Sequence, residues 1–106
     1  MRWLIILALS VAPAFAQDEL KDARERFDLV ATRATAYLHS ADSIEARLNE
    51  DGATLHPQLI ALRLRIVASL NEARRAIDKG EVKGANRAMG TAEVLVDRFA
   101  KKIGGE

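Results

Sequence analysis

The chain has 106 residues, no cysteine, and 16 Lys and Arg residues against 15 Asp and Glu residues. The lack of cysteine excludes disulfides and thiolate ligands for zinc or iron–sulfur clusters, and the balanced charge argues against a nucleic-acid-binding protein. The length allows one domain.

The first sixteen residues have the three parts of an export signal. Met1-Arg2 is a short positive start, residues 3–11 (WLIILALSV) are almost entirely apolar, and residues 14–16 (AFA) are of the type that a signal peptidase accepts. The apolar stretch is about 14 residues long, whereas a transmembrane helix needs about 20. We therefore predict cleavage after Ala16 and a single helical domain over residues 17–106, without a transmembrane span, that is periplasmic or secreted. The alternative is an uncleaved anchor or a buried N-terminal helix.

Charge is divided unevenly along the remaining chain. Residues 17–51 contain nine acidic and five basic side chains, and residues 52–106 contain six acidic and ten basic ones. In one interpretation an acidic first helix lies against basic later helices of the same chain. In the other, the basic half binds an anionic partner.

A long amphipathic helix is predicted over residues 18–48. Apolar residues recur there at heptad positions a and d over four heptads. They are Leu20, Ala23, Phe27, Val30, Ala34, Tyr37, Ala41, Ile44 and Leu48. Ser and Thr residues lower the helix propensity in the middle of the segment, so a kink near His39-Ser40 is left open. Gly52, after a run of polar residues, ends the helix because it can adopt the left-handed conformation.

The second predicted helix covers residues 57–79, with Pro57 in its first turn. Its main apolar stripe consists of Leu59, Leu62, Ile66, Leu70, Ala73 and Ile77. Ile60, Leu64 and Val67 widen this stripe to about half of the circumference, so we expect the helix to contact two neighbours.

The third predicted helix covers residues 82–103 and follows a tight turn at Gly80. Its heptad positions are apolar: Val82, Ala85, Met89, Ala92, Val96, Phe99 and Ile103, with Ala88 and Leu95 beside them. Gly90 costs up to about 1 kcal/mol relative to Ala in a helix interior. Either close helix packing or an absence of selection would explain that glycine.

Short connections make consecutive helices antiparallel. The predicted fold is therefore all-α, with three antiparallel amphipathic helices: a long first helix and then a helical hairpin, the second helix being central. The first helix would be about 46 Å long and the second about 34 Å. One end of the first helix would then be uncovered, which raises self-association as an alternative.

The helical hairpin resembles one tetratricopeptide-type repeat over about thirty residues. The positions that match are Ala73, Gly80, Val82, Ala85, Met89 and Ala92. Ser69 and Glu72 stand where that pattern has large apolar residues, the closing proline is absent, and the pattern does not recur, although such repeats work in arrays of three or more. We interpret the resemblance as the shared geometry of helical hairpins.

No arrangement of chemically active residues emerges from the sequence. His39 and His56 do not form a two-ligand motif on one helix face. No serine stands in a glycine-rich turn, and no glycine-rich phosphate loop is present. We predict no catalytic residue, no metal site and no cofactor, and interpret His56 as a capping or linker residue.

The arginines of the second helix are the most informative polar residues. Arg63 and Arg74 fall inside its wide apolar arc. In one interpretation their stems lie on apolar surface and their guanidinium groups reach acids of the first helix. In the other they form, with Lys79, Lys83 and Arg87, a surface for a phosphate, a lipid headgroup or an acidic peptide.

These observations predict a small, exported, non-catalytic helical protein of the bacterial cell envelope. We expect a protein-interaction or structural module that binds a protein partner, or itself, through its apolar stripes. The alternative is a binder of anionic envelope components, such as lipid headgroups or acidic polymers, through the basic surface on the second and third helices.

Overall fold

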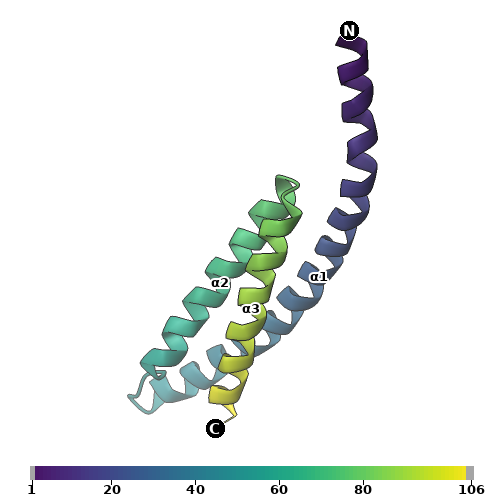
Figure 1. Ribbon diagram of the computed structural model, residues 1–106. Coiled ribbons are helices and arrows are strands. Elements are labelled where there is room, and N and C mark those ends of the chain that lie inside the picture. The colour runs from purple at the N-terminus through teal and green to yellow at the C-terminus, as the bar shows by residue number, and fades with distance from the viewer. Residues whose placement is uncertain (1, 105–106) are drawn as a thin grey trace.

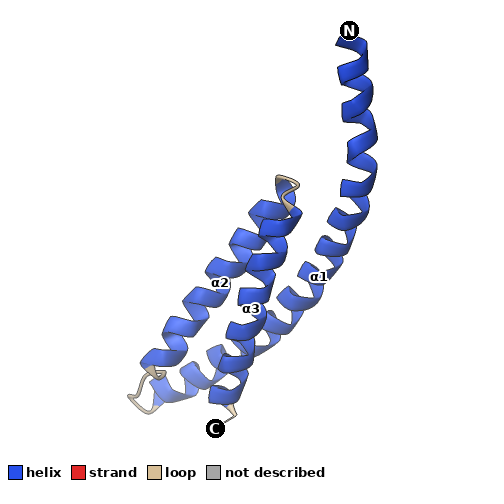
Figure 2. Cartoon of the chain, in the orientation of Figure 1, coloured by secondary structure: helices blue, strands red, loops and turns tan. Residues whose placement is uncertain are grey.

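The structure is a computed structural model that describes the backbone of residues 2–104 and the side chains of residues 18–104. Over that range the chain forms three helices and no strand: α1 (Arg2–Glu50), α2 (Pro57–Asp78) and α3 (Val82–Ile103) (Figure 2). The prediction of an all-α fold is confirmed. The predicted signal segment and the cleavage point after Ala16 lie outside the residues whose side chains are described.

The three helices pack as a bundle (Figure 1). α2 and α3 lie side by side and share the largest contact, and α1 runs along both of them. α1 packs more extensively against α3 than against α2. The expectation that α2 is the central helix was therefore wrong, because all three helices surround a common core.

Local sequence signals set the ends of the helices. Gly52 and Gly80 have φ angles of +79° and +75°, which L-residues rarely adopt. Beyond each helix end a backbone N–H turns back to a carbonyl: Ala53 donates to Leu48 at 2.8 Å, and Glu81 donates to Ala76 at 2.8 Å. The glycine stops that the sequence predicted are therefore present at both connections.

α1 continues as a helix through the Ser- and Thr-rich segment, although Figure 1 shows it curved. The hydroxyls of Thr35, Ser40 and Ser43 each donate to the carbonyl oxygen four residues earlier, at 2.8, 3.1 and 3.3 Å. Such bonds satisfy the hydroxyls locally and leave the helix intact. The helix is therefore unbroken at His39-Ser40, and instead of an interruption α1 shows a smooth curvature, which bonds of this kind often accompany (Figure 1).

The core consists of two clusters of buried side chains that differ in residue size. The first cluster, toward the end of the bundle away from the α2–α3 turn, consists mostly of large residues from all three helices and the α1–α2 connection: Ala34, Ala41, Leu55, Leu59, Leu62, Ile66, Leu95, Val96 and Phe99. The second cluster, near the α2–α3 turn, is mostly alanine: Ala23, Ala73, Ala76, Ile77, Ala85, Ala88 and Met89. Large side chains contribute more burial energy than alanine, so most of the hydrophobic stabilisation comes from the first cluster.

The expectation that the second helix contacts two neighbours is confirmed, because α2 packs against both α1 and α3. Leu64 and Val67, which widen its apolar stripe, nevertheless remain 66% and 43% exposed. Leu20 packs against the alanine cluster near one end of the bundle, and Leu55, 2% exposed, covers α1 at the other end from the α1–α2 connection. Toward the N-terminus, α1 continues past the α2–α3 turn (Figure 1), and self-association stays a prediction.

Candidate functional site

Arg63 is engaged by two carboxylates of α1. Its Nη1 lies 3.2 Å from Asp42 Oδ1 and 3.3 Å from Glu45 Oε1, and its Nη2 donates to Glu45 Oε2 at 3.3 Å. The hydrogen bond to Glu45 raises the pKa of Arg63, against a lowering by partial burial. The interpretation of Arg63 as an interhelical ion-pair residue is therefore confirmed.

Two further ion pairs join α1 to α3 with the opposite polarity. Arg26 of α1 pairs with Glu93 of α3 at 2.8 Å, and Arg33 of α1 pairs with Asp97 of α3. The hydrogen bond to Asp97 raises the pKa of Arg33, whose guanidinium also lies 5.7 Å from the centre of the Tyr37 ring. The interpretation of an acidic first helix against basic later helices thus holds for α2 but is reversed at the α3 contact.

The other residues of the predicted basic surface do not converge with Arg63. Arg74, Lys79, Lys83 and Arg87 are all exposed. Arg74 lies eleven residues from Arg63, about 16 Å along α2. It forms no ion pair with any side chain of residues 18–104, so the interpretation that it reaches an acid of the first helix was wrong. The five residues therefore cannot contact one small ligand together.

Lys83 has acidic neighbours. It lines a shallow groove between α1 and α3, and the same groove is lined by Glu19 and Asp22 of α1. These carboxylates offset its charge, so this part of the surface is mixed rather than basic.

A different set of cations does converge, in a groove between α2 and α3 at the end of the bundle farthest from the α2–α3 turn. The groove has a volume of about 350 Å³. It is lined by Gln58, Ala61, Leu62 and Arg65 of α2 and by Arg98 and Lys102 of α3. No carboxylate stands among these lining residues.

Sequence reasoning missed this groove for a physical reason. Arg98 and Lys102 are four residues apart, so a shared helix face could be predicted. Arg65, however, comes to the same place only through the register of α2 against α3. That register depends on how the core side chains interlock, which no local pattern determines.

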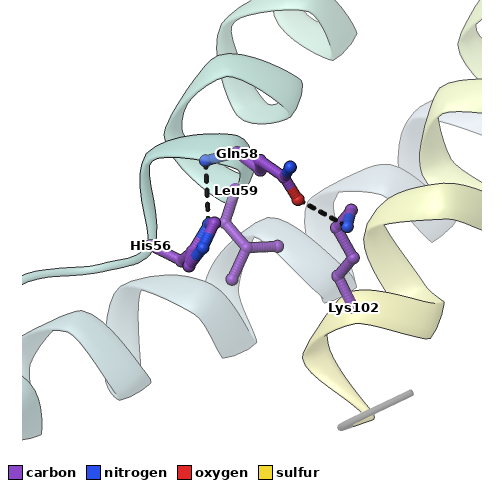
Figure 3. A pocket seen from close by; sticks show the side chains of 4 residues that line it. All are labelled: His56, Gln58, Leu59 and Lys102. Carbon is purple, nitrogen blue, oxygen red and sulfur yellow. Dashed lines mark hydrogen bonds between the residues drawn. The ribbon is translucent and has the colours of Figure 1, made fainter.

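A neighbouring pocket of about 220 Å³ shares two residues with the groove and is lined by His56, Gln58, Leu59 and Lys102 (Figure 3). His56 Nδ1 accepts a hydrogen bond from the backbone N–H of Gln58 at 3.1 Å, as a helix N-cap does. Lys102 Nζ donates to Gln58 Oε1 at 2.6 Å and so connects α3 to the start of α2 (Figure 3). The interpretation of His56 as a capping residue is confirmed.

The exposed large apolar residues lie on three different helices. Leu29 of α1 is 74% exposed, Val94 of α3 is 51% exposed, and Leu64 and Val67 stand together on α2. Ile60, half-buried because it packs against the first core cluster, precedes Leu64 by one helical turn and connects the exposed pair to the core. Positions 60, 64 and 67 share one side of a helix, so α2 carries the only such stripe among the described side chains.

Over residues 18–104, no three His, Asp or Glu side chains come together in a way that could hold a metal ion. Within the same range, no helix combines the length and the hydropathy that a membrane span requires.

Comparison with known proteins gives no relative from which a function could be transferred: no family model, no curated protein and no solved structure matches this chain.

Proposed function

We propose that this protein is a small, exported, non-catalytic helical component of the bacterial cell envelope, acting as a protein-interaction or structural module. Export is supported by the pattern of residues 1–16, in which a short positive start, an apolar run and small residues follow one another. In this proposal the mature chain begins at Gln17 and works in the periplasm or outside the cell. Its three helices form an antiparallel bundle of amphipathic helices.

One observation carries the interaction role: the apolar stripe of Ile60, Leu64 and Val67 on α2. Leu64 and Val67 belong to no core cluster and keep 66% and 43% of their surface in solvent. Full burial of an aliphatic side chain of this size contributes about 1.5–3 kcal/mol. A partner helix with apolar residues at the matching spacing of three and four would gain this energy by covering the stripe.

The experiment is crosslinking and affinity capture of the tagged protein from its native envelope, with Leu64→Gln compared to Leu29→Gln. Both substitutions remove an exposed leucine from a helix surface, so neither should unfold the protein. We expect Leu64→Gln to abolish the capture of one specific partner and Leu29→Gln to leave it unchanged. Equal capture by both variants would contradict the proposed role of the stripe.

Salt and protein concentration distinguish the kinds of partner. Apolar contact between helices should survive high salt, whereas contact between charges should weaken. If the partner is a second copy of this chain, the melting temperature should rise with protein concentration.

A second candidate function, binding of an anionic envelope component, is favoured by the basic groove between α2 and α3. Arg63 is engaged by Asp42 and Glu45, so the groove residues Arg65, Arg98 and Lys102 are better placed for that role than the surface that the sequence predicted.

A further inference from the structure

The groove between α2 and α3 differs in charge from the contacts that the arginines form between α1 and the other two helices. At the α1 contacts, Arg26, Arg33 and Arg63 each meet a carboxylate of the opposite helix. In the groove, Arg65 faces Arg98 and Lys102 without a carboxylate among the lining residues. Three positive charges around one shallow groove raise the local electrostatic potential and attract anions.

The groove also has a fixed polar group and an apolar floor. Lys102 Nζ donates to Gln58 Oε1 at 2.6 Å, which holds the ammonium group at the groove and leaves two of its three N–H donors for a ligand. Leu62 is buried beneath the groove and Ala61 lies at its edge. The volume of about 350 Å³ is at the lower end of the range for small-molecule sites.

We propose that this groove binds a phosphate group through Arg65, Arg98 and Lys102. The planar guanidinium matches the spacing of phosphate oxygens and can donate two parallel hydrogen bonds to them. The apolar floor provides contact for the carbon atoms of a phosphate ester. The phosphate belongs to a free phosphate or soluble phosphate ester, or to the headgroup of an anionic lipid. The inference rests on the second function proposed above and specifies its site.

The test is an NMR titration of the purified protein with inorganic phosphate and with glycerol phosphate, at low ionic strength. We expect saturable shifts of the backbone amides around residues 58–65 and 98–102. Arg65→Gln and Arg98→Gln should each weaken phosphate binding about tenfold or more, the usual effect of losing a charge-assisted hydrogen bond. Arg24→Gln, which removes an exposed charge from α1 near the opposite end of the bundle, should change the affinity less than about twofold.

Vesicles distinguish the two sources of the phosphate. Sedimentation with phosphatidylglycerol vesicles, but not with phosphatidylcholine vesicles, together with loss of binding in Arg98→Gln, indicates a lipid headgroup. Saturable binding of glycerol phosphate without vesicle binding indicates a soluble ester. Both results support the groove.

Two results would overturn the proposal, and only one of them would also exclude anion binding as the second candidate function. In the first result, phosphate binds, but Arg24→Gln weakens the binding as much as Arg65→Gln and Arg98→Gln do. The net charge of the protein is then responsible and the groove is not the site, although the protein still binds anions. If neither phosphate compound gives saturable shifts and neither vesicle binds the protein, the second candidate function fails together with its site. Melting curves of all three variants, expected to agree with one another because these side chains are exposed, exclude unfolding as the cause.

Discussion

Removal of Arg63 offers the sharpest test of how the helices hold together. The Arg63 side chain is 25% exposed and Glu45 31%, whereas Asp42 is 65% exposed. Exposed ion pairs contribute about 0.2–1 kcal/mol, and breaking a fully buried pair costs about 3–5 kcal/mol. The burial of the Arg63 ion pairs lies between these two cases, and most of their contribution to stability comes from the two hydrogen bonds with Glu45. We therefore expect Arg63→Gln to lower the free energy of unfolding by about 1–2 kcal/mol.

The assay is thermal unfolding followed by circular dichroism, with Arg74→Gln as the matched control. Arg74 is exposed on the same helix and forms no ion pair with the described side chains. For a domain of this size, 1 kcal/mol corresponds to about 4–8 °C in Tm. Arg63→Gln should thus lower Tm by at least about 4 °C, and Arg74→Gln by less than about 2 °C.

A double-mutant cycle with Glu45→Gln should give a coupling energy of about 0.5–1.5 kcal/mol. Because the hydrogen bond to Glu45 raises the pKa of Arg63, the guanidinium loses its positive charge only in strongly alkaline solution. Acidic or neutral buffers therefore do not remove the charge of Arg63. Equal melting temperatures for the Arg63 and Arg74 variants, or a coupling energy of zero, would refute the reasoning.

Three further predictions concern the core and the helix ends. Phe99 is fully buried in the first core cluster, so Phe99→Ala should lower the free energy of unfolding in urea by about 3–5 kcal/mol. An unchanged urea midpoint would mean that this cluster does not dominate stability. His56→Ala should cost about 1 kcal/mol because the Gln58 N–H loses its acceptor, and His56→Asp should restore the loss; calorimetry of both variants checks this. Gly90→Ala should raise the free energy of unfolding by about 0.5–1 kcal/mol, since nothing lies within 4 Å of an added Cβ. Gly80→Ala should lower it by about 1–2 kcal/mol, because the φ of +75° is strained for alanine. Equal effects of the two substitutions in denaturant unfolding would contradict both predictions.

The helices and most of the core could be predicted because they depend on local patterns. The heptad positions of α3 fix which side chains are buried, and all of them except Val82 and Ile103 are fully buried. Gly52 and Gly80 stop the helices before them through their own conformational freedom. These features need only the neighbours within one or two helical turns.

Features that depend on how two helices align could not be predicted. Leu64 looks like a core residue by spacing, yet it is exposed because α1 and α3 together do not cover that side of α2. Leu55 lies in a connection without periodicity, so no pattern predicted its burial. The groove of Arg65, Arg98 and Lys102 and the reversed pairs of Arg26 and Arg33 follow from interhelical register for the same reason.

The unequal sizes of the two core clusters imply that the bundle does not open uniformly. Near the α2–α3 turn, alanines such as Ala73 and Ala85 provide close backbone approach but little buried area, whereas Phe99 and Ile66 secure the other end. Regions with less buried apolar surface exchange their amide hydrogens through smaller, local openings. Fluctuations should therefore begin where α2 turns into α3 and leave the end that carries the basic groove closed, so a ligand there would meet a preformed surface.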